Sequence, residues 1–338
     1  MKGAIPFLSM FCFFACSENA SSPLQIRPDV EISPVVISET AKAYLFDSLE
    51  MKEVRIVFRN DETENLDYVR FTKDSTTAVE FVSDLDVYHP SISPDGKWVA
   101  FSTSPEPIPR SSRIYVQPLE KMETSRLALD VQGTVPRWRI VGGDTVLIYA
   151  TSSGVNDKDS YWKSQGTWMV SFQKGEFGVP RQIFSGFYHG GVSGDLRLAV
   201  TGSHYLRVHS ELSGNMLDTV WYDSSQICNV SLSTDGSLRT LFLDLGAERG
   251  RKFSGMDYEP HHRILIADSL GNLISSIPSP DRHSFDFPEW VYGSDRFVSV
   301  MAALDAHRKL SLLDIRDSSV HVLLSGNELW HPDIWLSK

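Results

Sequence analysis

Residues 88–102 read Tyr88-His89-Pro90-Ser91-Ile92-Ser93-Pro94-Asp95-Gly96-Lys97-Trp98-Val99-Ala100-Phe101-Ser102. Apolar, β-branched and aromatic residues flank a Ser-Pro-Asp-Gly centre, which is the pattern of two short strands joined by a turn. Proline at the second turn position followed by Asp-Gly fits a tight chain reversal. The stretch therefore predicts a β-hairpin whose first strand ends at Ser93 and whose second strand is Trp98–Ser102.

The first strand of this hairpin recurs along the chain. Six copies align on one apolar anchor residue, and successive anchors lie 40 to 58 residues apart: Ile92, Trp138, Val192, Leu232, Trp290 and Ile334. This period is typical of a four-stranded propeller blade. Long apolar stripes of helical period are absent after Tyr44. We therefore expect an all-β fold, a six-bladed β-propeller over residues 41–338.

The two ends of the chain each carry part of one blade. Strand patterns precede Ile92 without an anchor strand, whereas Ile334 is an anchor with no blade after it. Joining the two parts would hide sheet edges that otherwise invite aggregation. We predict that Trp330–Leu336 is the innermost strand of the N-terminal blade and closes a ring of six blades.

Two resemblances support this fold. The stretch Ser93–Ser102 resembles the Ser-Pro-Asp-Gly repeat of TolB-like, WD-like propellers, with weaker copies at Ser233–Gly236 and Ser193–Asp195. More of the chain resembles the Fibrobacter paralogous lipoprotein family, in the segments Val135–Arg139, Gly143–Val146, Tyr188–Gly191, Leu198–Gly202 and Leu329–Pro332. The resemblance implies an envelope lipoprotein and assigns no activity, because a fold by itself does not fix function.

The N-terminus has the pattern of a lipoprotein signal. Lys2 precedes an apolar run from Ile5 to Ala15, which is too short to span a bilayer. Cys16 follows the small residue Ala15 and resembles a lipobox cysteine, so we expect residues 1–16 to be signal peptide and lipobox, with lipid on Cys16. Residues 17–40 are Ser/Pro-rich and polar, and we expect a flexible linker. By the usual sorting pattern, Ser17 after the cysteine indicates the outer membrane of the cell envelope.

Composition limits the partners. The 338 residues carry a net charge of −11, which argues against nucleic acid and against an anionic membrane face. Beyond Cys12 and Cys16 only Cys228 remains, so no intrachain disulfide forms in the mature chain. We expect a monomer without cofactor that engages an envelope protein or a cell-surface or plant polysaccharide.

Three anchors carry histidine three residues before the apolar position, namely His89, His189 and His331. In a closed ring these side chains would surround one channel mouth. Neutral imidazoles that converge on an axis can bind a transition metal, with His89 and His331 as the nearest pair. This arrangement resembles some metal-dependent polysaccharide lyases with propeller folds. The alternative is a structural role at the strand entry.

Two long loops between second and third strands are the other candidates. Residues 151–166 contain Tyr161 and Trp162, and residues 244–262 contain Tyr258 and His261. Aromatic residues on long loops suit a sugar or peptide surface, and we expect them on the histidine face. The alternative is that the aromatic side chains fold over the blade edge.

Signature motifs of catalysis are absent from the sequence. Gly191-Val192-Ser193-Gly194 lacks the spacing of a nucleophile elbow, and no zinc-protease, phosphate-loop or dinucleotide motif occurs. The sequence therefore favours a non-catalytic binding module. The alternatives are a metal-dependent polysaccharide lyase and a TolB-like scaffold subunit of an envelope complex.

Overall fold

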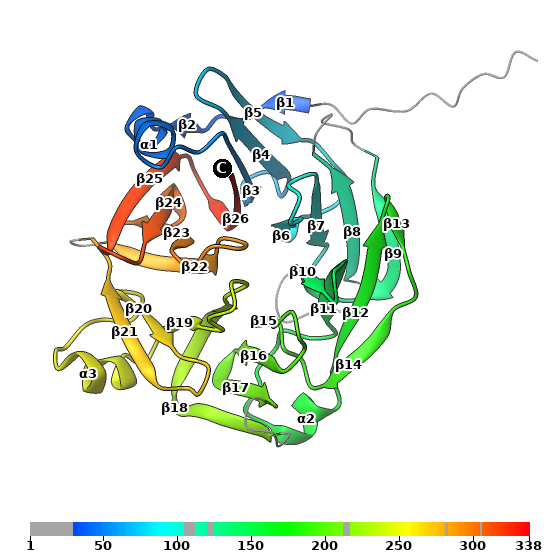
Figure 1. The fold of residues 1–338 in the computed structure, drawn as a ribbon, viewed down its shortest axis with the longest axis vertical. Helices are drawn as coiled ribbons and strands as arrows, with labels where there is room; N and C mark the ends of the chain where they lie inside the picture. The colour runs from blue at the N-terminus through cyan, green and yellow to red at the C-terminus, as the bar shows by residue number, and fades with distance from the viewer. Residues whose placement is uncertain (1–29, 105–111, 120–124, 212–216, 281–282, 305) are drawn as a thin grey trace, which may run out of the picture.

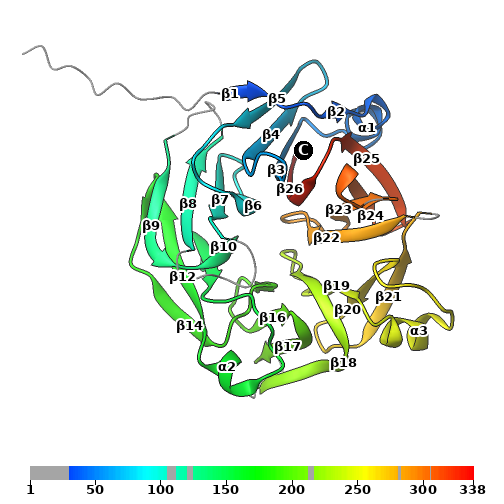
Figure 2. The same cartoon turned by 180° about the vertical axis from the view of Figure 1, so that it is seen from behind.

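The computed structural model describes residues 30–338 except 105–111, 120–124, 212–216, 281–282 and 305. Short antiparallel sheets stand around a central axis in a propeller-like ring, and both views down the axis show the same arrangement (Figures 1 and 2). The described helical segments are short: α1 (Glu39–Ala43), the π-helical turn η1 (Tyr44–Ser48), α2 (Asp159–Lys163), α3 (Glu248–Ser254) and the 3-10 turn η2 (Ala306–Arg308). The fold is all-β, as the sequence predicts.

The first three sheets hold the N-terminal half of the fold. One sheet has the order β1 (Val30–Ile32), β5 (Thr76–Phe81), β4 (Leu66–Phe71), β3 (Glu53–Asn60), β26 (Leu329–Ser337). The next has β6 (Tyr88–Ile92), β7 (Trp98–Ser102), β8 (Arg113–Pro118), β9 (Leu127–Gln132). The third has β10 (Thr134–Val141), β11 (Asp144–Ala150), β12 (Gly166–Gln173) and β13 (Glu176–Phe177), with β14 (Arg181–Ser185) also on β12.

The other two sheets complete the ring. A seven-stranded sheet has the order β15 (Gly191–Val192), β16 (Leu198–Gly202), β17 (His204–Ser210), β18 (Leu217–Leu232), β19 (Thr240–Asp244), β20 (Arg263–Ala267), β21 (Leu273–Pro278). The last has β2 (Val36–Ile37), β25 (Ser319–Ser325), β24 (Lys309–Asp314), β23 (Phe297–Ala303), β22 (Ser284–Trp290). The sequence predicts six separate sheets; the described residues form five, because the 16-residue strand β18 pairs with β17 along its first part and with β19 along its second.

The hairpin that begins the sequence analysis is confirmed. β6 pairs antiparallel with β7, and Gly96 adopts a φ of 74° in the turn, a value that favours glycine. The Ser93 hydroxyl donates to Asp95 (2.6 Å) and accepts from the backbone N–H of Trp98 (3.0 Å). The same Ser-to-Asp bond recurs at Ser193 and Asp195 (2.6 Å). The Ser-x-Asp pattern therefore fixes these turns by side chain-to-backbone hydrogen bonds.

A β-bulge recurs at the start of the innermost strands. The ladder register shifts in the innermost strands β6, β10, β22 and β26 and in β18. In each of these copies the residue three before the anchor has a φ between 45° and 50°: His89, Val135, Asn229, Phe287 and His331. A bulge bends the strand and re-aims a side chain. Five of the six copies therefore share one backbone feature; in the sixth, the positive φ is at Gly191 (128°), one residue before the anchor Val192.

The hydrophobic core is divided among clusters that lie between neighbouring sheets. Ile92 and Val99 of the second sheet pack with Tyr68 and Phe81 of the first, for example. Trp138 packs with Val116 and Phe172 in the next cluster. Each sheet is thus covered on both faces near the axis, which explains why inner strands such as β16, β19 and β23 are buried along their whole length.

The predicted pairing of the C-terminal strand is confirmed. β26 pairs antiparallel with β3, with Ile334 opposite Ile56, and lies at the inner edge of the first sheet (Figure 1). The Trp335 indole donates to the Pro94 carbonyl (3.0 Å) in the neighbouring hairpin. The last residues of the chain are therefore part of the core and not a tail.

The expected linker over residues 17–40 is wrong in its second part. Val30–Ile32 pairs with the outer strand β5, and Val36–Ile37 pairs with the outer strand β25. These short strands occupy open sheet edges, a use that the Ser/Pro-rich composition does not indicate. Cys16 and residues 17–29 lie outside the described residues. In the described part of the chain, no helix has the length and hydropathy needed to cross a membrane.

Candidate functional site: the channel mouth

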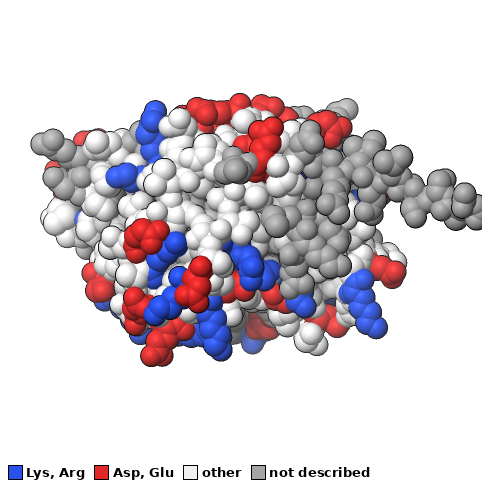
Figure 3. Space-filling model, turned by 90° about the horizontal axis from the view of Figure 1, so that it is seen from above, with Lys and Arg blue, Asp and Glu red and all other residues white. Residues whose placement is uncertain are grey.

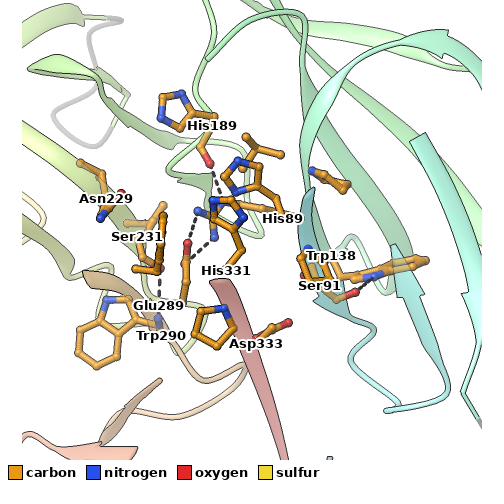
Figure 4. A pocket seen from close by; sticks show the side chains of 18 of the residues that line it. His89, Ser91, Trp138, His189, Asn229, Ser231, Glu289, Trp290, His331 and Asp333 are labelled. Carbon is orange, nitrogen blue, oxygen red and sulfur yellow. Dashed lines mark hydrogen bonds and ion pairs between the residues drawn. The ribbon is translucent and has the colours of Figure 1, made fainter. Parts of the chain in front are cut away.

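The innermost strands surround a channel with a cavity of about 100 Å³. All six residues that stand three before an anchor line it: His89, Val135, His189, Asn229, Phe287 and His331. In five of the six strands the recurrent bulge explains this convergence, since it turns the same position of the strand toward the axis. Figure 4 shows the three histidines around this cavity.

His89 and His331 lie side by side, with ring centroids 3.9 Å apart and planes 36° from each other (Figure 4). Burial and the neighbouring His89 hold the pKa of His331 well below its usual value, so this ring is neutral. His189 instead bonds Thr201 through Nδ1 (3.0 Å). Among the described residues no group of three or more His, Cys, Asp or Glu could hold a metal ion. The His89 and His331 rings thus pack against each other at a tilt.

An ion pair bridges the channel below the histidines. Arg137 of β10 donates two hydrogen bonds to the two carboxylate oxygens of Glu289 of β22, both of 2.6 Å. Its Nε donates to the backbone carbonyl of His189. Bidentate pairs of this kind are strong and geometrically specific. β10 and β22 lie on different sides of the axis (Figure 1), so the pair crosses the channel and narrows it.

Asp333 joins the C-terminal strand β26 to the next sheet. Its carboxylate accepts from the backbone N–H groups of Ile92 (2.6 Å) and Ile334 (2.9 Å). Burial raises the pKa of Asp333 to about 7, and the nearby Glu289 acts in the same direction. The carboxyl group is therefore a structural link and also a proton-binding group near neutral pH.

Aromatic rings around His89 and His331 form a continuous half-buried surface, here called the mouth surface: Tyr88, His89, Phe287, His307, Trp330 and His331. The Phe287 ring lies 4.3 Å from His331 and 5.3 Å from Trp330, and the His307 ring lies 4.0 Å from Trp330. Tyr88 lies 6.2 Å from His331 on the other side. These residues come from β6, η2, β22 and β26. In the sequence, Tyr88 and Trp330 each stand directly before a histidine of the channel, and this pattern could have indicated the surface. No sequence pattern marks His307 as part of it.

Carboxylates hold one edge of the mouth surface in place. His307 Nε2 lies 3.2 Å from Asp286 Oδ2, and its Nδ1 lies 3.9 Å from Glu328. Glu328 also accepts from the Trp330 indole (3.2 Å). Asp286 and Glu289, close in sequence, therefore serve different partners, His307 and Arg137.

The two long loops do not join the channel residues. α2 and α3 lie at the periphery of the ring (Figures 1 and 2), and neither Tyr161, Trp162, Tyr258 nor His261 lines the channel cavity. Trp162 is 2% exposed and packs edge-on against Tyr188, with Arg207 over its ring. None of the four residues reaches the channel, and both loops contact the neighbouring sheet, through Asn156 on Tyr205 and His261 on Phe285. A common face for these residues and the histidines therefore stays a prediction.

The remaining loop candidates have structural contacts of their own. His261 Nδ1 bonds the Phe285 carbonyl (2.9 Å), which ties the loop to β22. The Tyr258 hydroxyl fills the space over Gly250, where a Cβ would lie only 1.4 Å from its oxygen. Tyr161 keeps an exposed ring (41%) and bonds Ser152 (2.8 Å). Of the loop candidates, Tyr161 is the one with a largely accessible ring.

Comparison with known proteins supports the fold and assigns no function. No family model matches the sequence, and no curated protein is a detectable relative. Among solved structures, the chain is similar to hydrazine synthase from Kuenenia stuttgartiensis (TM-score 0.53, 9% identity, 85% of this chain and 47% of that one). It is also similar to a protein of unknown function from Bacteroides caccae (0.51, 9%, 85% and 99%) and to TolB from Acinetobacter baumannii (0.48, 15%, 87% and 70%). The chain thus spans about half of the hydrazine synthase chain.

Proposed function

We propose that the ring is a six-bladed β-propeller in which the seven-stranded sheet supplies two blades. Its two halves meet at β18 and have a hydrophobic cluster of their own between them, with Leu206 and Val208 against Phe242 and Leu265. The other described clusters lie between different sheets. Five sheets with one divided at β18 therefore account for six anchors, and the β26–β3 pairing closes the ring.

The function that this geometry supports best is a non-catalytic binding module that takes its partner on the mouth surface. The main support is the group of half-buried aromatic and imidazole rings that contact one another at one end of the channel. Aromatic residues around a small pocket with a polar rim are the usual energetic centre of an interface. Asp286, Asn229 and Glu328 supply such a rim.

The size of the channel favours a protein partner. About 100 Å³ is less than the cavity of ~150 Å³ that holds one benzene molecule, and a hexose ring is larger than benzene. A short protein side chain fits, whereas a sugar chain could only lie across the opening. The Arg137–Glu289 pair limits the depth of entry.

Charge supports the same class of partner. The chain carries a net charge of −11, and the side of the ring in Figure 3 shows acidic side chains along one edge and both signs along the other. No continuous basic surface is seen among the residues described on that side. This distribution does not suit a polyanion such as nucleic acid.

The proposed location is the cell envelope, with a lipid on Cys16 and the outer membrane as the site. The support is the N-terminal sequence pattern, in which Cys16 ends a short apolar run and polar residues follow. Lipid labelling of wild-type chain and of Cys16→Ser tests it; equal labelling of both would contradict the proposal.

The binding proposal is tested by site-specific photocrosslinking. A photoreactive phenylalanine replaces Tyr88 on the mouth surface or, as control, Tyr292 at the opposite end of the channel. We expect a crosslinked envelope protein from Tyr88 alone, and its loss when Trp330→Ala is added. Binding to a polysaccharide without a protein crosslink would indicate the other partner class. Equal crosslinking from both positions would refute the mouth surface as the site.

A further inference from the structure

The opposite end of the channel holds a second hollow, here called the turn-side hollow, of about 290 Å³. It lies where the Ser193–Asp195 and Ser233–Gly236 turns meet, at the far end of the inner strands from the mouth surface. Arg139, Thr234 and Tyr292 line it, with Asp195 and Asp235 in its two turns. The mouth surface contributes no residue to it.

Arg139 is a buried cation without an acidic partner. Its side chain is at the inner wall of the hollow and the residue is 6% exposed. It donates to three backbone carbonyls, those of Trp138 (2.7 Å), Val192 (2.7 Å) and Leu232 (3.4 Å). Among the described residues no Asp or Glu forms an ion pair with it. A guanidinium has five N–H donors, so the carbonyls leave two of them unused.

An uncompensated buried charge is costly, and a negative ligand would remove that cost. Burial lowers the pKa of Arg139 to about 10, which still leaves the guanidinium charged at neutral pH. Its planar fork matches the two oxygens of a carboxylate or phosphate group. The hollow thus offers a partly desolvated cation of the right geometry.

Two hydroxyl groups add donors in the same hollow. Thr234 Oγ1 accepts from the backbone N–H of Gly293 (2.6 Å), so its own proton is available for donation. The Tyr292 hydroxyl accepts from the backbone of Ile140, and burial raises the pKa of Tyr292, which keeps the phenol protonated. Guanidinium and two O–H donors are the complement of an oxyanion.

The two aspartates at the rim are engaged elsewhere. Asp195 accepts from the Ser193 hydroxyl (2.6 Å) and from the Arg197 backbone (3.1 Å). Asp235 accepts from the Ser237 hydroxyl (2.7 Å) and lies 3.5 Å from Arg239. Their charges are therefore partly balanced. The remaining negative charge at the rim favours a ligand of low negative charge.

We infer that the turn-side hollow binds the carboxylate or phosphate group of a small ligand through Arg139, Thr234 and Tyr292. The site shares no residue with the mouth surface, although Arg139, Thr234 and Tyr292 also line the far end of the channel cavity. With this site the protein would have two binding sites, one at each end of the channel.

The test measures thermal unfolding of the full chain in rising sodium phosphate or sodium acetate, against sodium chloride at equal ionic strength. A ligand that binds only the folded state raises the unfolding temperature with its concentration. We expect such a rise for the wild type and at least a tenfold weaker apparent affinity for Thr234→Val/Tyr292→Phe. The salt that gives the larger rise identifies the source of the oxyanion.

A matched control carries the same chemical changes elsewhere, at the exposed Thr219 and at Tyr161. Thr219→Val/Tyr161→Phe should respond as the wild type does. Arg139→Lys, which keeps the charge but loses the fork, should lose the response as well. If Arg139→Lys does not fold, the hydroxyl variant decides alone. No anion-dependent rise in the wild type, or an equal rise in the hydroxyl variant, overturns the inference.

Discussion

The Asp333 carboxylate accepts a hydrogen bond of 2.6 Å from the backbone N–H of Ile92, 241 residues earlier in the chain. The bond joins the C-terminal strand β26 to the inner strand β6 of the neighbouring sheet. The position of β26 therefore depends on a side chain as well as on the β26–β3 ladder.

Asp333→Ala should lower the free energy of unfolding by about 1–3 kcal/mol, because it leaves the buried N–H of Ile92 without an acceptor. Urea denaturation followed by tryptophan fluorescence measures the loss. Asp130→Ala, whose side chain is 97% exposed, is the matched control and should change stability by no more than about 0.5 kcal/mol. Equal effects of the two variants would show that the Asp333 link is not stabilising.

Asp67 should make stability depend on pH. It is buried in β4, accepts from the Ser33 hydroxyl and lies opposite Glu80 in the ladder. Burial raises the pKa of Asp67 to about 7, so the folded chain holds this proton more tightly than the unfolded chain. The stabilisation is complete below about pH 4 and is lost as pH rises through 7, by up to ~1.4 kcal/mol per pH unit.

Asp67→Asn keeps an acceptor for Ser33 and removes the titration. Denaturation between pH 4 and 8 should show the wild type losing stability relative to this variant as pH rises. Parallel curves for the two proteins would contradict the assignment. Asp333, with a pKa also near 7, remains in both proteins and cancels in the comparison.

The Arg137–Glu289 pair should show strong energetic coupling. In a double-mutant cycle with Arg137→Gln and Glu289→Gln we expect about 1–3 kcal/mol, because both side chains are mostly buried (15% and 26% exposed). The exposed Lys252–Glu248 pair is the control and should give no measurable coupling, because water screens it. A coupling at the control level would mean that water screens the channel pair.

Neighbouring residues of α2 should respond differently to truncation. Trp162→Ala should cost about 3–5 kcal/mol because it empties a buried site, whereas Tyr161→Ala removes an exposed ring and should cost about 1 kcal/mol or less. Chemical denaturation of the two variants measures the difference. A mild effect of Trp162→Ala would restore the loop as a candidate ligand surface.

The metal alternative has a direct test. We expect the purified chain to bind no stoichiometric divalent ion, because the His89 and His331 rings pack against one another, with centroids 3.9 Å apart. Elemental analysis after dialysis against zinc and manganese, for the wild type and for His89→Ala/His331→Ala, decides it. A bound ion that the double variant loses would favour the metal-dependent enzyme.

Much of the architecture was predictable because it repeats. The six anchors and the Ser-x-Asp turns mark positions where the backbone must bend or reverse, and both features appear at those positions. The C-terminal strand was predictable because Ile334 lacks a blade of its own. It was not predictable that β18 runs continuously through two halves of one sheet, because this depends on the hydrogen bonding between its pairing with β17 and its pairing with β19.

The site was less predictable than the fold. A repeat locates His89 and His331 on the channel, but nothing in the sequence pairs Arg137 with Glu289 across it, because that contact depends on ring geometry. The direction in which loops 151–166 and 244–262 fold also has no local signal. Trp162 was expected on a surface and is buried. The sequence does not distinguish the two cases, because an aromatic residue on a loop can either bind a ligand or pack into the core.

The two short strands before α1 have a mechanical consequence. Tension on the N-terminal end of the chain would reach β1 first, and this three-residue strand would peel from β5 one hydrogen bond at a time. β2 on β25 would be next in line, while the β26–β3 ladder near the axis would stay unloaded. A chain held at its N-terminus and pulled in this way would release its N-terminal segment from the sheet edges before the ring opened.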